Sequence, residues 1–389
     1  MITRLFSLGA VLLLAACSGS SLEPLNQPVP LSDFTPRVDT QLAWVKQLDQ
    51  GIDRDYLRLR PLIDGERVFA ADKDGQVIAY DSRNGDRQWQ QRLQRSITAG
   101  PGDGVNSLFI GSEEEVIALD KSDGHELWHT SVSSSVLVEP VLAGELVIVR
   151  SVDGRVHALD RYSGAKRWEF NQPVPTLSLQ GLSRPLVMDQ AVIIGFANGH
   201  VVALGRDNGQ LYWESSAGTP HGRTELERLS DVDADLIASD GVLYAASYHG
   251  KVSAMILGTG EMLWSRALSS YTGMAMDSKN LYVTDENGDL WALSRRNGAA
   301  LWKQDVLHGR TLSTPVLQGR FVVVGDYAGY LHWFDKEEGH LVGRAQVKDW
   351  DDAFFPGQKP FVTHYPTKRD VLARPPVAGQ EHHAWLGNG

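Results

Sequence analysis

Cysteine is almost absent from this sequence, because Cys17 is the only one among its 389 residues. The body of the chain can therefore form neither an intramolecular disulfide nor a thiolate metal cluster, since both need more than one thiol. Long apolar runs are lacking too, because no stretch beyond the N-terminal region is apolar for long enough to cross a bilayer as a helix. Any attachment to a membrane is expected to come from the N-terminus alone.

Clusters of basic residues are also missing. The 48 Asp and Glu residues outnumber the 37 Lys and Arg residues, the formal net charge is −11, and the charges are interspersed along the chain. Nucleic-acid binding needs a concentrated positive surface. The sequence therefore predicts a protein that binds no nucleic acid and whose charged residues mostly form a solvated surface.

The common catalytic motifs are absent as well. The sequence contains no Gly-x-Ser-x-Gly, no Walker-type glycine loop and no His-Glu-x-x-His. Residues 231–235 begin like a calcium-binding loop, but Leu236 and Val242 stand where that loop needs Gly and Glu. The neighbouring His382 and His383 are interpreted as incidental. We therefore predict no catalytic residues, no metal site and no cofactor.

The N-terminus has the features of an exported lipoprotein. Arg4 precedes an apolar run over residues 5–14, and Leu-Ala-Ala-Cys ends at Cys17. This pattern resembles a lipobox, in which the signal peptide is cut before an acylated cysteine. We expect residues 1–16 to be a lipoprotein signal peptide, Cys17 to carry the lipid anchor, and residues 17–40, rich in Ser and Pro, to form a flexible tether. An ordinary secretory signal with an incidental cysteine is the alternative.

The body of the chain is built on a repeated phrase. Its first copy has Gly75, Ala79, Gly85 and Trp89, and the phrase recurs seven times in all. The last copy differs, with Trp333 in the Ala position and Gly343 in the Trp position. The Trp residues of the six other copies are Trp89, Trp128, Trp168, Trp213, Trp264 and Trp302.

Each copy of the phrase reads as a hairpin. Val77, Ala79 and the equivalent positions of the other copies recur with the period of two expected of a strand with one buried face. Gly85 stands where a tight turn needs positive φ, and Trp89 lies on the returning strand, where its ring can fill the gap between sheets. A second strand pair precedes each hairpin. The intervals between successive Trp residues, 39, 40, 45, 51 and 38 residues, match propeller blades of four strands.

These repeats predict an all-β fold, an eight-bladed β-propeller with four-stranded antiparallel blades over residues 41–347. Trp44 stands 45 residues before Trp89 without its own upstream phrase. We interpret it as part of an N-terminal strand that closes the last blade. Residues 348–389 form an atypical C-terminal tail, because they contain no repeat phrase and are dense in proline, which opposes regular strands.

Two connections between blades are enlarged. The longest Trp intervals, from Trp168 to Trp213 and from Trp213 to Trp264, contain residues 173–181 and 219–235. Both insertions follow the Trp strand, so they are expected to emerge side by side on one face of the ring. Insertions in repeat proteins commonly build the binding face. Leucines beside acidic residues on these loops indicate a protein-binding patch, although Leu177 and Leu179 could instead pack onto the blade.

The repeat resembles that of quinone (PQQ) dehydrogenases, which implies an enzyme with a calcium-bound cofactor and, in many members, a disulfide of adjacent cysteines. The single cysteine and the lack of sequence beyond the blades argue against this reading. A binder of peptidoglycan or another envelope ligand is a further alternative.

The lipobox, the repeat and the phrases at residues 177–181 and 228–233 together resemble the BamB family, lipoprotein subunits of the outer-membrane β-barrel assembly (BAM) machinery. The resemblance implies a non-enzymatic scaffold on the periplasmic face of the outer membrane. Its implied partners are the POTRA domains of BamA, other BAM subunits and unfolded outer-membrane proteins. The family's BamA-contacting motif matches Leu177, Leu179, Gln180, Asp231 and Asp233. The family has a basic residue where this chain has Gln180, so a charge pair at this position is in doubt.

Overall fold

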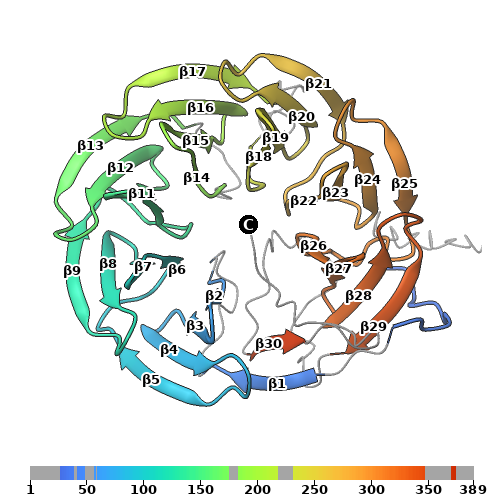
Figure 1. Cartoon of the computed structure of the whole chain (residues 1–389), viewed down its shortest axis with the longest axis horizontal. Helices are drawn as coiled ribbons and strands as arrows, with labels where there is room; N and C mark the ends of the chain where they lie inside the picture. Colours follow the sequence, from blue (N-terminus) through green and yellow to red (C-terminus); the bar gives the residue numbers. More distant parts are fainter. Residues whose placement is uncertain are drawn as a thin grey trace, which may run out of the picture.

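The computed structural model describes residues 27–38, 42–48, 57, 59–174, 183–217, 231–346 and 369–373. The regular structure within these ranges consists of strands, β1 to β30 (Figure 1). A search of the same ranges finds no helix that is long and apolar enough to cross a membrane.

Seven antiparallel sheets of four strands surround a central axis like the blades of a propeller (Figure 1). In each blade the strands follow one another in chain order from the axis to the perimeter. Blades 1 to 4 are β2–β5, β6–β9, β10–β13 and β14–β17. Their strands span Leu62–Asp64, Arg67–Ala71, Gln76–Asp81 and Arg87–Arg92; Ala99–Asp103, Ser107–Gly111, Glu115–Asp120 and Glu126–Ser131; Val141–Ala143, Leu146–Arg150, Arg155–Asp160 and Lys166–Asn171; and Leu186–Val187, Ala191–Gly195, His200–Gly205 and Leu211–Ser216.

Blades 5 to 7 continue the ring as β18–β21, β22–β25 and β26–β29. Their strands span Ile237–Ser239, Val242–Ala246, Lys251–Ile256 and Met262–Ala267; Met274–Met276, Asn280–Thr284, Leu290–Ser294 and Ala300–Gln304; and Val316–Gln318, Phe321–Gly325, Tyr330–Asp335 and Leu341–Gln346.

The prediction of eight four-stranded blades is wrong, because the described residues form seven. The chain ends contribute a two-stranded sheet instead, in which β1 (Leu42–Gln47) pairs antiparallel with β30 (Arg369–Ala373). In Figure 1, β1 lies on the perimeter between β5 and β29. Proline cannot donate a ladder hydrogen bond. The proline-dense C-terminal region accordingly adds only β30 to the described structure, where a full blade would need three strands.

The pairing of Ala with Trp across each hairpin explains the fixed spacing between these two residues in the repeat. In blades 1 to 6 the Ala of the third strand lies directly opposite the Trp of the fourth, and the register shifts just after this pair. The small side chain leaves room beside the ring. The strand register thus places a small side chain opposite each large one in these six blades.

Each Trp ring joins its blade to the next one. The indole N–H donates a hydrogen bond to a backbone carbonyl of the following blade, at N···O distances of 2.9 to 3.2 Å. Trp44 makes the same contact with the carbonyl of Ser82 in blade 1, at 3.0 Å. The N-terminal strand therefore docks on blade 1 in the way that each blade docks on its successor.

The glycine in the turn of the following blade lies against the same ring. A Cβ added at Gly209 would lie 2.6 Å from the ring of Trp168, and one at Gly85 would lie 2.8 Å from the ring of Trp44. Both glycines also have positive φ, +68° and +73°. The repeated glycine is therefore required twice, by the turn and by the neighbouring tryptophan.

The hydrophobic core lies mainly between blades. One cluster joins Phe69 and Ala79 of blade 1 to Leu108 and Ile117 of blade 2, and similar clusters join each further pair of successive blades up to blade 7. The ring is thus a series of nearest-neighbour contacts.

The described N-terminal segment, residues 27–38, runs along blade 7. The backbone N–H of Val29 donates to the carbonyl of His308 at 3.0 Å, and that of Arg37 donates to the carbonyl of Val342 at 2.8 Å. Arg344 donates to the carbonyl of Ser32 at 3.1 Å. The second half of the predicted tether therefore lies against the propeller.

Candidate partner-binding site

Two connections between neighbouring blades are longer than their counterparts. Residues 172–185 join β13 to β14, and residues 217–236 join β17 to β18, whereas residues 93–98 suffice between β5 and β6. All of these connections leave the outer strand of a blade at the same end. They therefore share one face of the ring, which we call the connection face.

The described ends of the two long connections meet at Gly195, the last residue of β15. A Cβ added there would lie 2.4 Å from Val232 Cγ1 and 2.8 Å from Ser183 Oγ. Ser183 Oγ donates to the carbonyl of Gly195 at 3.3 Å, and the N–H of Val232 donates to the carbonyl of Phe196 at 3.2 Å. The prediction that the two connections are neighbours is thus confirmed for their described ends.

Asp231 and Asp233 flank the buried Val232, and both are buried themselves, with exposed fractions of 0% and 1%. The carbonyl of Asp231 accepts a hydrogen bond from the N–H of Tyr248 at 3.0 Å, which fixes this segment to blade 5. The two carboxylates therefore lie beneath the connection face. Direct contact between either carboxylate and a partner would require this segment to move.

The other predicted site residues lie outside the described residues. These are Leu177, Leu179 and Gln180 of the first connection and the predicted lipidation site Cys17.

A charged group that sequence reasoning missed lies at the end of the second connection. Asp235 Oδ2 forms an ion pair with Arg60 Nη1 at 2.7 Å, and its Oδ1 accepts a hydrogen bond from the N–H of Arg184 at 2.9 Å. The available signal was a charged residue two positions before the inner strand in several repeats. Such a signal appears only when the repeats are aligned on that strand rather than on the Trp.

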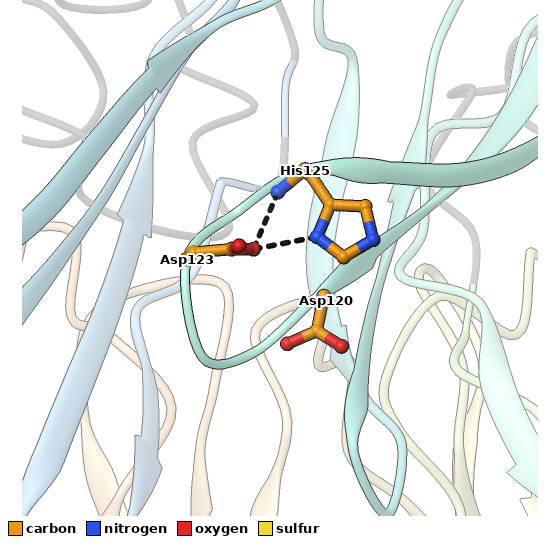
Figure 2. A group of neighbouring side chains, drawn as sticks. All are labelled: Asp120, Asp123 and His125. Carbon is orange, nitrogen blue, oxygen red and sulfur yellow. Dashed lines mark hydrogen bonds and ion pairs between the residues drawn. The ribbon is translucent and has the colours of Figure 1, made fainter.

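One group of side chains has the composition of a metal site. Asp120, Asp123 and His125 lie in the turn between β8 and β9, with potential ligand atoms within 4.8 Å of one another (Figure 2). Asp123 Oδ1 accepts the N–H of His125 at 3.0 Å and lies 2.7 Å from its Nδ1. This hydrogen bond raises the pKa of His125, so that a proton competes with any metal ion for this exposed ring.

The same turn recurs where no such group is present. Asp120 Oδ1 accepts the N–H of the residue two positions on at 2.7 Å, and Asp81, Asp160 and Asp335 do the same in blades 1, 3 and 7. The carboxylates shape the turn between the third and fourth strands. This repeated structural role accounts for the group, and we assign no metal site to it.

The strand order, the Ala–Trp pairs and the glycine turns define a β-propeller of PQQ-like repeats. Three comparisons place it more narrowly. A family profile described as outer membrane protein assembly factor BamB matches residues 37–99 and 73–304. The chain belongs to this family.

Individual relatives agree with this assignment. The chain is 34% identical to the outer membrane protein assembly factor BamB of Yersinia pestis over 361 residues, which cover 89% of this chain and 91% of that protein. It is 41% identical to the protein of the same name from Alkalilimnicola ehrlichii over 341 residues, 87% and 88% of the two chains.

Solved structures show the same relationship. The crystal structure of BamB from Moraxella catarrhalis superposes with a TM-score of 0.73 at 30% identity and covers 80% of this chain and 92% of that chain. A europium-containing methanol dehydrogenase superposes with a TM-score of 0.64 at 12% identity and covers 79% of this chain and 81% of that one. The second likeness concerns the fold alone.

Proposed function

We propose that this protein is a lipid-anchored, non-enzymatic scaffold of the BAM complex on the periplasmic face of the outer membrane. It binds the POTRA domains of BamA through the connections 172–185 and 217–236, and it assists the assembly and insertion of β-barrel proteins. Cys17 carries the anchor. Membership of the BamB family supports this role.

The convergence of the two long connections at Gly195 carries the proposal of a site. Two loops that meet on one face offer a continuous surface of the kind that protein partners need. We place Leu177, Leu179 and Gln180 at the partner, and Asp231 and Asp233 beneath it, where their burial supports a role in shaping the connection.

The outer strands suggest how unfolded barrel proteins could be held. Each fourth strand is the edge of its blade, and exposed apolar side chains gather on β17, β21 and β25 of blades 4 to 6, namely Leu211, Tyr212, Met262, Leu263 and Leu301. An extended substrate segment can add to such an edge by β-augmentation. Photo-crosslinking from position 263 to an unfolded barrel protein tests this part.

The binding site is tested by co-purification with BamA from membranes. Leu177→Ala, Leu179→Ala and Asp231→Asn are expected to reduce the amount of BamA recovered. Leu127→Ala is the matched control, because Leu127 is an exposed leucine on β9, away from the two connections. Unchanged recovery with the first three variants would show that the partner binds another surface.

A further inference from the structure

Four charged residues occupy one position of the repeat. Each lies two residues before the inner strand of its blade, and their signs alternate in chain order: Arg60 before β2, Glu139 before β10, Arg184 before β14 and Asp235 before β18. The inner strands surround the central axis (Figure 1). The repeat therefore brings these four side chains together around the axis, on the connection face.

The shortest ion pair in this group crosses the ring. Arg60 Nη1 lies 2.7 Å from Asp235 Oδ2, although blade 1 and blade 5 stand on opposite sides of the axis in Figure 1. Glu139, which is 7% exposed, lies between the two arginines, 3.9 Å from Arg60 and 3.7 Å from Arg184. The arginines and carboxylates thus neutralise one another in a partly buried place.

Asp235 uses its second oxygen for the other long connection. Oδ1 accepts the backbone N–H of Arg184 at 2.9 Å, and Arg184 lies near the end of the connection 172–185, two residues before β14. Asp235 lies at the equivalent place near the end of the connection 217–236. One carboxylate therefore joins the ends of both connections, and Arg60 holds that carboxylate from across the axis.

We propose that Arg60 and Asp235 are positioning residues that fix the described ends of the two long connections relative to each other and thereby help to preform the partner-binding surface. This inference rests on the proposed function. Ordering loops during association lowers affinity, so a contact that orders them beforehand raises it. A hydrogen bond from the main-chain N–H of Arg184 and a charge-assisted pair with Arg60, both on one carboxylate, supply that order without touching the partner.

The inference is tested with the full-length protein and a purified POTRA fragment of BamA. Arg60→Ala is expected to weaken binding about tenfold, and Asp235→Ala at least as much, because it also loses the hydrogen bond from Arg184. Because Arg60 is proposed to act through Asp235, the double variant is expected to bind no more weakly than Asp235→Ala. Arg60→Lys, which keeps the charge, should restore part of the affinity.

Lys121→Ala is the matched control. Lys121 is a buried cation that binds Asp64 at 2.7 Å and Asp103 at 2.6 Å, on the face opposite to the connections. We expect this variant to lose thermal stability while its affinity stays unchanged. An equal loss of affinity in Lys121→Ala and Arg60→Ala would overturn the inference, because binding would then follow general stability.

The loop variants separate the two proposals. If Leu177→Ala and Leu179→Ala abolish binding while Arg60→Ala binds like the wild type, the proposed site stands and the positioning role is wrong. If all three variants bind like the wild type, the proposed site itself is wrong. If Asp235→Ala fails to fold, Asp235→Asn removes the charge but keeps an acceptor for Arg184, and its wild-type affinity would equally contradict the positioning role.

Discussion

Trp333 on β28 lies directly opposite Gly343 on β29, at the position where the other six blades pair Ala with Trp. Blade 7 therefore also pairs one large side chain with one small residue, but its large ring lies on the third strand instead of the fourth. Trp333 is 1% exposed and donates from Nε1 to Gln318 Oε1 at 2.6 Å. The Trp333 ring thus packs and bonds within its own blade, and the outer strand β29 has only a glycine at this position.

This exchange predicts coupling between the two positions. A Cβ at Gly343 would lie 3.3 Å from Val38 and 3.4 Å from Trp333 Cβ. Gly343→Val is therefore expected to lower the free energy of unfolding by about 1–3 kcal/mol. In a Trp333→Ala background this loss should be smaller, because the Trp333 ring is gone, whose Cε3 would lie 3.7 Å from the added Cβ. Urea unfolding of the wild type, the two single variants and the double variant measures both losses. Equal losses in the two backgrounds would contradict the coupling.

The glycine turns predict an effect beyond backbone strain. Gly209 and Gly65 both have positive φ, but a Cβ at Gly209 would meet the Trp168 ring at 2.6 Å, while nothing lies within 4 Å of one at Gly65. Gly65→Ala is expected to cost about 1–2 kcal/mol through strain alone. Gly209→Ala should cost about 1–3 kcal/mol more, through overpacking. Thermal unfolding compares the two variants. Similar melting temperatures would show that the Trp168 ring moves aside at no cost in stability.

His332 predicts a dependence of stability on pH. Burial lowers the pKa of His332 below its ordinary value of 6.5, and the attraction of Asp326, 3.0 Å away, does not offset this. Arg344 Nε donates to His332 Nδ1 at 3.3 Å, which also requires the neutral ring. Burial likewise lowers the pKa of His157.

The sign follows from proton binding. Between the lowered folded pKa and 6.5 the unfolded chain binds more protons, so stability is complete above pH 6.5 and is lost as the pH falls through this window. His332→Gln should reduce the slope of unfolding free energy against pH between about pH 7.5 and about pH 5.5. A slope identical to that of the wild type would contradict the prediction.

Arg344 predicts protection of the N-terminal segment. It donates to the carbonyl of Ser32, and its guanidinium lies 5.0 Å from the centre of the Phe34 ring. Arg344→Ala is expected to speed amide hydrogen exchange at Arg37, whose N–H bonds to blade 7. Arg320→Ala is the control, because Arg320 is exposed and pairs with Asp335 in the same blade. Equal exchange in both variants would show that Arg344 does not hold the segment.

The features that recur in each repeat could be predicted from the sequence. The blades, the Ala and Trp positions and the glycine turns all follow from local patterns that recur, so they could be read without a structure. The number of blades could not be read in this way, because Trp44 makes the contact of a blade but lies in a two-stranded sheet.

The site was predictable in part for a related reason. Interval lengths revealed the two connections and their shared face, because these follow from strand order. The burial of Asp231 and Asp233 did not follow, since an acidic residue in a loop is ordinarily assigned to the surface. The pair of Arg60 and Asp235 joins blades on opposite sides of the ring, and no local pattern specifies such a contact.

The described residues before blade 1, 27–38 and β1, contact both the first and the last blade of the series. Trp44 docks on blade 1, while Ser32 is bonded to Arg344 of blade 7, 312 positions away in the sequence. Contacts between neighbouring blades are local, whereas a contact of this separation closes a very long loop. By sequence separation, the contacts of residues 27–38 with blade 7 are therefore expected to form after those between successive blades.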